Sequence, residues 1–513
     1  MPGHVFIVRG DLRRLVCDGW LMPASREGRP EPKWLRPDAP EPDWPDPPAD
    51  FRNGERRVLE VSDRPADQPR PWLVNLDAGP DAPADWFLDG ACQFLAAAGP
   101  AAKGAPVTGR AKPLLALPII NNAPEPLRPD AARVVAGLLP LLLDAVKPGA
   151  FDVALVAHDG PAFAAAQAAR AQAGGGWPGL GPNLRRKADE LAAFATRGEL
   201  ALFLGAGVSA GAGVPLWGEL LDQLARRAGM SDCDRTALRR LHLLDQAGVI
   251  ERRLGGADEL REAVRDLSAR DHYGLTHALL ASLPVREAVT TNYDELFEVA
   301  WEARGRRPSV LPYRLRPKAD AWVLQMHGSV SHPEDIVLTR EHQLAYEDRH
   351  AALAGIVQTL LLTRHMLFVG FSLSDDDFHR IADDVRRVLR SLEAPADGKS
   401  PAGKPFGTAV VLRRRRLVEE LWGDDLRWVG MGRAGGRDPA RRLEVFLDYL
   451  LTRTRDTAHL LDARYERLLD GGERALRAAL TEFVRRAPAA ARSAAAWHRV
   501  ERFLSGLGYR GDS

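Results

Sequence analysis

The sequence contains little cysteine and almost no excess charge of either sign. Its three cysteines, Cys17, Cys92 and Cys233, lie far apart among 513 residues, and no two of them form a CxxC pair. This excludes a disulfide scaffold and a cysteine-rich zinc module. Basic residues number 70 and acidic residues 69, so no overall field attracts nucleic acid or an anionic membrane.

Long apolar runs are missing as well. The N-terminal run Val5–Val8 is short and ends at Arg9, so we expect no signal peptide, and the most apolar stretch, 134–146, contains Pro140 and Asp144. These absences predict a cytoplasmic protein with no membrane anchor and no specific nucleic-acid binding. Hydrophobic residues still make up 45% of the chain, and its length predicts about three domains.

What the sequence does contain is an alternation of short apolar segments and amphipathic helices. Such alternation predicts α/β layers with mainly parallel sheets, whose binding sites form at the C-terminal ends of the strands. The expected strands are 5–8, 72–76, 114–119, 153–157, 200–204, 287–290, 322–326, 335–339, 366–369 and 408–412.

Glycine and proline clusters mark the expected domain boundaries. We predict an α/β domain over 1–173, a linker with a lead-in helix over 174–194, a second α/β domain over 195–455 and a helical C-terminal extension over 456–513. The extension is expected because leucines between 460 and 469 recur at helical spacing. Whether the chain forms a homo-oligomer is left open.

The second α/β domain begins with an apolar strand that runs into a glycine turn. Residues 205–209 read Gly-Ala-Gly-Val-Ser, and a helix is expected to open at Trp217. Glycines let a backbone approach a phosphate closely, and a helix N-terminus attracts anions. The spacing of Gly205, Gly207 and Ala210 fits a relaxed dinucleotide fingerprint, although a tight turn without a ligand would look the same. The acidic residue that a dehydrogenase needs after its second strand is not found.

Three further strand ends carry small or polar residues. They are 290–294 (Thr-Thr-Asn-Tyr-Asp), 326–329 (Met-His-Gly-Ser) and 369–374 (Val-Gly-Phe-Ser-Leu-Ser). Together with the glycine turn, in this order and spacing, they resemble the sirtuin-like NAD-consuming family, above all its bacterial antiphage-defence branch, over about 195–455. The resemblance implies a Rossmann-like sheet that takes NAD as its substrate. It also implies hydrolysis to nicotinamide and ADP-ribose, with NAD depletion as the means of defence.

The resemblance also implies a role for individual residues. His327 would be the catalytic base, and Asn292 would contact the nicotinamide ribose and help to place the attacking water. Asp294 would bind the nicotinamide carboxamide. The other NAD-binding positions that it implies are Gly205, Ala206, Gly207, Ser209, Pro215, Gly370 and Ser372.

Each polar residue also has a purely structural interpretation. His327 would then be a strand-end histidine bonded to backbone, Asn292 a turn-forming asparagine and Asp294 a helix cap, the last being equally weighted with ligand binding. The acidic run 375–377 is interpreted as a helix cap and not as a metal cluster, so no metal site is predicted.

Protein-deacetylating sirtuins carry a four-cysteine zinc module after the His-Gly motif. Here no cysteine follows Cys233, so we expect no zinc and water as the acceptor. Two alternatives stay open. One is an NAD-dependent protein ADP-ribosyl- or deacyl-transferase, and the other is a non-catalytic sensor that binds NAD or ADP-ribose.

The N-terminal part, 1–173, resembles a macro domain, which is an ADP-ribose-binding α/β module. The resemblance rests on Arg-Gly-Asp-Leu at 9–12 after the first strand and on the next expected strand at 17–24, and it implies that Asp11 binds adenine. Pro-Ala-Ser at 23–25 and Asn-Asn-Ala at 121–123 depart from the family's loops, so we expect a degenerate module. Our hypothesis is that it senses a nucleotide or phage-derived activator and gates the NAD site.

Overall fold

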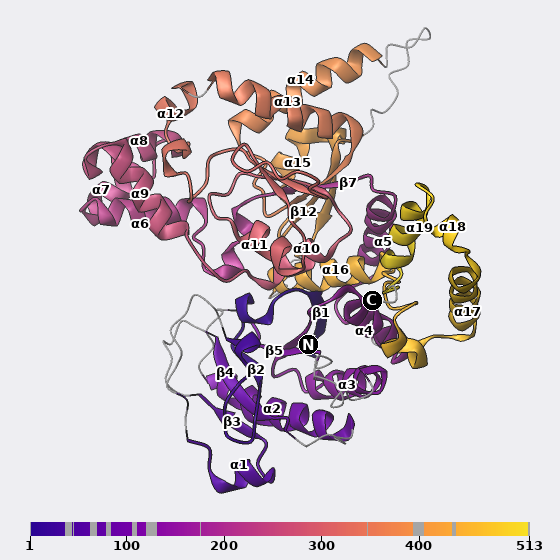
Figure 1. Cartoon of the computed structure of the whole chain (residues 1–513). Coiled ribbons are helices and arrows are strands. Elements are labelled where there is room, and N and C mark those ends of the chain that lie inside the picture. The colour runs from indigo at the N-terminus through magenta and orange to yellow at the C-terminus, as the bar shows by residue number, and fades with distance from the viewer. Residues whose placement is uncertain are drawn as a thin grey trace. The chain divides into compact units, whose positions relative to one another are not determined.

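The structure is a computed structural model that describes residues 2–35, 44, 46–61, 69–77, 84–104, 110–119, 131–174, 176–345, 347–392, 405–432 and 438–510. The chain divides into two compact units (Figure 1). Unit 1 comprises 1–180 and 451–513, and unit 2 comprises 181–450. Each unit is a mainly parallel sheet with helices, which confirms the predicted α/β class. Among the described helices, none is long and apolar enough to cross a membrane.

Unit 1 contains a six-stranded sheet in the order β1-β6-β5-β2-β4-β3, with β3 antiparallel to β4 and the other pairs parallel. Its strands are β1 (Val5–Arg9), β2 (Gly19–Ala24), β3 (Val58–Glu60), β4 (Arg70–Asn75), β5 (Leu114–Pro118) and β6 (Asp152–Ala157). Strands such as β5 and β6 are buried along their whole length, which explains why they are continuous apolar runs. The described helices from the N-terminal part of the unit are α1 (Ala49–Asn53), α2 (Ala84–Gly104), α3 (Ala131–Val146) and α4 (Gly160–Gln172).

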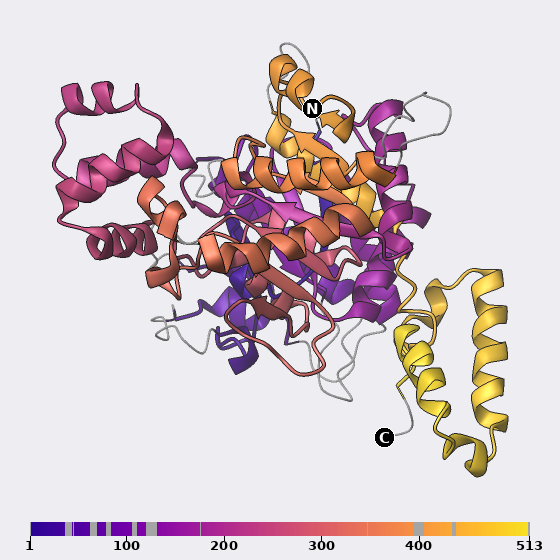
Figure 2. The same ribbon diagram turned by 90° about the horizontal axis from the view of Figure 1, so that it is seen from above.

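The C-terminal segment of the chain packs within unit 1. Its elements are the 3-10 helix η7 (Ala463–Leu468) and the helices α17 (Gly471–Arg486), α18 (Ala489–Arg492) and α19 (Trp497–Gly506). Helices α17 and α19 lie side by side (Figure 2) and share a small core that includes Leu461, Val484 and Leu504. The tail is therefore helical as predicted, but the leucines of 460–469 lie in turns and a 3-10 helix. The predicted domain boundaries stay a prediction, and the 121–123 loop lies outside the described residues.

Unit 2 contains a seven-stranded parallel sheet in the order β13-β12-β11-β7-β8-β10-β9. Its strands are β7 (Leu200–Leu204), β8 (Glu287–Thr290), β9 (Ser309–Leu311), β10 (Trp322–Gln325), β11 (His365–Val369), β12 (Gly407–Val411) and β13 (Leu426–Gly430). The chain enters at β7, builds β8 to β10 on one side and then returns to place β11 on the other. The strand order therefore reverses between β7 and β11, where open α/β sheets bind ligands at their carboxyl edge.

Helices cover both faces of the unit 2 sheet. Helices α13 and α14 lie on one side of it, and α10, α11 and most of α16 lie on the other (Figure 1). Helices α6 to α9 form a lobe whose core also includes Tyr293, Ile336 and Leu338. The helices are α5 (Pro182–Thr196), α6 (Trp217–Arg227), α7 (Asp232–Leu238), α8 (Leu243–Leu254), α9 (Ala257–Ser268), α10 (Leu275–Ser282), α11 (Leu296–Ala303), α12 (Arg340–Ala345), α13 (Glu347–Thr363), α14 (Asp376–Leu392), α15 (Arg416–Trp422) and α16 (Pro439–Arg453).

The predicted strand at 335–339 is wrong. Asp335 ends a 3-10 helix, η5 (Pro333–Asp335), and the residues after it pair with no strand. Ile336, Val337 and Leu338 are nonetheless buried. A buried apolar run of this length looks like a strand in the sequence, but here it closes over the end of β10, where the Val337 amide donates to the His327 carbonyl.

Candidate active site

The first part of the site is a backbone contact between two loops, one after β7 and one after β11. The Gly205 amide donates to the Val369 carbonyl and the Gly207 amide to the Gly370 carbonyl. A side chain at Gly205 would lie 2.6 Å from the Gly370 oxygen, and one at Gly370, whose φ is +67°, would lie 2.5 Å from the Val208 nitrogen. These glycines are required by the loop-to-loop approach, and the Gly207 amide is already used in it.

The second part is a buried hydrogen-bond network centred on Ser209. The Gly274 amide donates to Nδ1 of His277, at 3.2 Å, and Nε2 of His277 lies 3.2 Å from the Ser209 hydroxyl. Burial lowers the pKa of His277 to about 3, so the ring is neutral and carries its proton on Nε2. The Asn292 amide, from the loop after β8, donates to the same hydroxyl at 3.0 Å.

This network orients the Ser209 proton. Both lone pairs of its hydroxyl oxygen accept hydrogen bonds, from His277 and from Asn292, so its own proton is donated to the side chain of Asp294. Burial raises the pKa of Asp294 to about 6, although hydrogen bonds from Ser209, the Leu296 amide and Asn292 favour the ionised form. The result is a carboxyl group poised near neutral pH at the edge of the sheet.

Asn292 offers one further polar atom. Its Nδ2 is fixed on Ser209, whereas its Oδ1 is buried and finds no hydrogen-bond donor among the residues that the structure describes. Buried acceptors are rarely left in this state, because the missing bond costs about 1–3 kcal/mol. An acceptor held in place by its own amide group is suited to a hydroxyl or water of a ligand.

His327 lies at the end of β10, beside the loop that carries Asn292. The Met326 amide donates to the Thr290 carbonyl, so the two loops leave neighbouring strands at the same level. Gly328 adopts a φ of +93°, and a side chain there would lie 2.5 Å from the Asp335 carbonyl oxygen. The backbone therefore holds His327 in a fixed place, with only 6% of the residue exposed.

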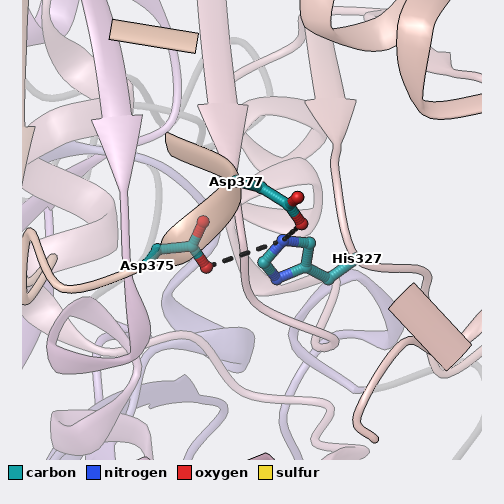
Figure 3. Close-up of side chains that lie close together, drawn as sticks. All are labelled: His327, Asp375 and Asp377. Carbon is teal, nitrogen blue, oxygen red and sulfur yellow. Dashed lines mark ion pairs between the residues drawn. The ribbon is translucent and has the colours of Figure 1, made fainter. Parts of the chain in front are cut away.

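Two carboxylates face the His327 ring (Figure 3). Its Nε2 lies 3.7 Å from Oδ2 of Asp375 and 3.7 Å from Oδ2 of Asp377, at the start of α14. Burial acts to lower the pKa of His327, but the charges of Asp375 and Asp377 outweigh it, so that the pKa is raised above its ordinary value. Among the described residues, this trio is also the group whose donor atoms lie close enough to hold a metal ion.

The structure brings most of the predicted site residues to one edge of the unit 2 sheet. Ser209, Asn292 and Asp294 form one hydrogen-bonded set, Gly205, Gly207 and Gly370 form one backbone contact, and His327 lies at the neighbouring strand end. Ser372 is exposed and its hydroxyl lies 2.7 Å from that of Ser374. Ala206 and Pro215 are partly buried, and their side chains have no polar atom that could join this network. The roles predicted for these residues in NAD binding stay predictions.

Sequence reasoning missed two features of the site. His277 lies inside the buried helix α10 and carries no local signal. The interpretation of the acidic run at 375–377 as a helix cap is confirmed, because the Phe378 amide donates to Oδ1 of Asp375. Its position after β11, at the same sheet edge as His327, was the signal that its carboxylates also face the histidine.

In unit 1, the carboxylate of Asp11 is bound locally. It accepts bonds from the Arg13 backbone amide and from Nε and Nη2 of Arg13, at 2.7–3.1 Å. The adenine-binding role predicted for Asp11, and the macro-like nature of 1–173, stay predictions.

Comparisons with known proteins connect the unit 2 site to one family. The SIR2-like domain family matches residues 286–397. The NAD(+) hydrolase ThsA of Enterococcus faecium is 32% identical over 213 residues, which cover 39% of this chain and 42% of that protein. The ThsA of Bacillus cereus is 29% identical over 196 residues, 36% of this chain and 40% of that protein.

A third relative, the defense-associated sirtuin 2 of Bacillus subtilis, is 23% identical over 208 residues, 39% of this chain and 20% of that protein. The chain thus covers about two fifths of the length of the ThsA proteins it matches. The predicted sirtuin-like domain is confirmed over 286–397, a range that includes Asn292, His327 and Asp375.

Proposed function

We propose that this chain hydrolyses NAD to nicotinamide and ADP-ribose in unit 2, and that it acts by NAD depletion in bacterial antiphage defence. The similarity to proteins named NAD(+) hydrolase and defense-associated sirtuin supports both parts. The observation that carries the proposal is the buried Oδ1 of Asn292, which has no hydrogen-bond donor among the described residues and follows the strand next to that of His327. A cytoplasmic location belongs to the proposal.

The reaction needs the groups that this sheet edge offers. The bond between ribose C1′ and the pyridinium nitrogen breaks, and the bonding electrons leave with nicotinamide as a neutral molecule, so no acid is needed. The ribose becomes cation-like and gains from a fixed polar environment. Oδ1 of Asn292 would accept a hydrogen bond from a ribose hydroxyl or the water. Water adds to C1′, and its proton would pass to the His327 ring and then to solvent.

Asp294 would contribute in a different way. With a pKa of about 6 it is mostly ionised at neutral pH, and Ser209 fixes its orientation. A buried carboxylate near the sheet edge stabilises positive charge that develops on the ribose, and it can accept a hydrogen bond from the carboxamide of nicotinamide. Water as the acceptor and the absence of zinc are also parts of the proposal. The proposal does not choose between NAD and NADP.

The test is to incubate the purified full chain with NAD and to separate nicotinamide and ADP-ribose by chromatography. His327→Ala and Asn292→Ala should each lower the rate of nicotinamide release by about 10²–10⁴-fold. His332→Ala is the matched control, because this partly exposed histidine also follows β10 but stacks on Tyr313, in the loop after β9. We expect it to retain the wild-type rate.

The products distinguish the alternatives. Nicotinamide without an equal amount of free ADP-ribose, together with ADP-ribose attached to protein, would favour a transferase. Binding of NAD with no cleavage by the full chain would favour a sensor. An activator acting through unit 1 is best sought by adding candidate nucleotides to the full chain, because the 451–513 segment packs with the N-terminal residues and a deletion of 1–173 would remove its partner.

A further inference from the structure

We propose that Asp375 and Asp377 are positioning residues that together clamp the His327 imidazole from the start of α14. The inference rests on the proposed function only for its kinetic readout. The clamp itself rests on geometry: one ring nitrogen, Nε2, lies at the same distance of 3.7 Å from an Oδ2 atom of each carboxylate (Figure 3).

Each carboxylate uses its two oxygens for different purposes. Oδ1 of Asp375 accepts the Phe378 amide at 2.9 Å and so caps α14, which leaves Oδ2 for His327. Oδ1 of Asp377 pairs with Arg380 at 3.4 Å, and Oδ2 faces His327. The local bonds therefore fix both carboxylates in the orientation that presents Oδ2 to the ring.

The loop before α14 is held in place by the core. Leu373 adopts a left-handed φ of +58°, is 2% exposed and gives its carbonyl to the Trp422 indole at 3.3 Å. A left-handed backbone is unfavourable for leucine, so the surrounding packing must impose this turn. The turn is what brings Asp375 and Asp377 to the end of β10.

Charge balance favours an imidazolium over a metal ion as the occupant. The groups that face the cluster from the packed elements are Arg380 on α14, Gln343 on α12, whose Nε2 lies 3.4 Å from Oδ2 of Asp377, and Tyr293 after β8, whose hydroxyl is bonded to the Val337 carbonyl. Two carboxylates, one guanidinium and one imidazolium sum to zero, whereas a divalent ion in place of the ring proton would leave a net positive charge.

The chemical consequence concerns the proton that His327 takes from the attacking water. When the proton of the attacking water reaches His327, the ring becomes the cation that the two carboxylates stabilise. The clamp thus makes His327 a stronger base and fixes the direction of its nitrogen. It also means that the base is protonated, and inactive, up to a higher pH than an unclamped histidine.

The test compares Asp375→Asn, Asp377→Asn and the double variant with wild type. Asparagine keeps the size and the Oδ1 acceptor that caps α14. The control is Asp376→Asn, which makes the same charge change at an exposed position between the two. We measure kcat and KM for nicotinamide release from mildly acidic to mildly alkaline pH, with and without EDTA and with added Mn²⁺.

In wild type the rate should fall as the pH is lowered through the pKa of His327, which lies above the ordinary histidine value. In each single variant this acid limb should move to lower pH by about one unit, and plateau kcat should fall about tenfold while KM changes little. Asp376→Asn should follow wild type. Superimposable pH profiles of wild type and the double variant would overturn the clamp. Loss of activity in EDTA that Mn²⁺ restores would overturn it in favour of a metal site.

A second readout does not need activity. Selective ¹³Cε1 labelling of the 13 histidines allows the titration of His327 to be followed by NMR, with its signal identified by its absence in His327→Gln. The signal should titrate at lower pH in the double variant than in wild type. If wild type releases no nicotinamide, the proposed function fails and this titration still decides the clamp. An unchanged titration would refute it.

Discussion

Both units end parallel strands with carboxylates, but they use them differently. In unit 1, Asp159 follows β6, caps α4 through the Ala162 amide and pairs with Arg464 at 2.9 Å. In unit 2, Asp294 and Asp375 also follow strands, but Asp294 accepts hydrogen bonds from Ser209 and Asn292, and Asp375 faces His327. A guanidinium neutralises a carboxylate permanently, whereas these partners leave its charge available to a reacting group. Whether a carboxylate at a strand end is structural or can take part in a reaction therefore depends on the group that it pairs with.

The largest effect should come from removing the hydroxyl at the centre of the unit 2 network. Ser209→Ala leaves the buried His277 and Asn292 donors without their acceptor, which should cost about 2 kcal/mol or more of stability. Thermal unfolding and nicotinamide release should both be impaired. The matched control is Ser372→Ala, an exposed hydroxyl at the same sheet edge, which should change stability by less than about 0.5 kcal/mol. Equal stability of the two variants would contradict the structural importance assigned to the buried Ser209 network.

Asp294→Asn should sharpen the comparison, because it removes a charge that is costly to the fold. The folded pKa of about 6 lies above the ordinary 3.8, so the wild type loses stability as the pH rises through about 6, and the amide does not. We expect the stability of the variant relative to wild type to increase by about 2–3 kcal/mol between pH 4 and neutral pH, and nicotinamide release to slow. Thermal melts over this pH range test the sign, and a stability difference that does not change with pH, or that moves in favour of wild type, would contradict it.

The smallest effect should appear in unit 1. Asp159→Ala removes a helix cap and one of the two acidic partners of Arg464, at a cost of about 1 kcal/mol. We expect a slightly lower unfolding temperature and an unchanged rate of nicotinamide release. Asp159→Asn, which keeps the capping oxygen, should recover most of the loss. A large change in rate would mean that this strand end is not merely structural.

The sequence predicted the strands that are continuous apolar runs, including the edge strand β1, but it missed the edge strands β3, β9 and β13. Central strands such as β7 and β11 are buried on both faces, so each is a continuous apolar run. The edge strands β3 and β9 have three residues each, and only Leu426 and Val429 of β13 are buried, so none of these strands forms such a run. The strand predicted at 335–339 is wrong for the opposite reason. Its residues form a buried apolar run, but no neighbouring strand pairs with them.

The site was predicted as a set of strand ends but not as a set of bonds. His327, Asn292 and Asp294 could be found because each directly follows an apolar strand. The hydrogen bond between His277 and Ser209 joins residues 68 positions apart in the chain, and no local sequence pattern predicts it. The pairing of His327 with Asp375 depends on β10 and β11 ending at one edge of the sheet, on opposite sides of β7, which only the strand order reveals.

The interlock of Gly205, Gly207 and Gly370 has a consequence for directed evolution. Because each loop occupies the space that a side chain of the other would need, a change in one loop must be accompanied by a matching change in the other. A library that diversifies residues 205–209 while leaving 370 untouched should return glycine at both contact positions. Grafting a new substrate preference onto this scaffold therefore requires both loops to be exchanged together, as a matched pair from one donor.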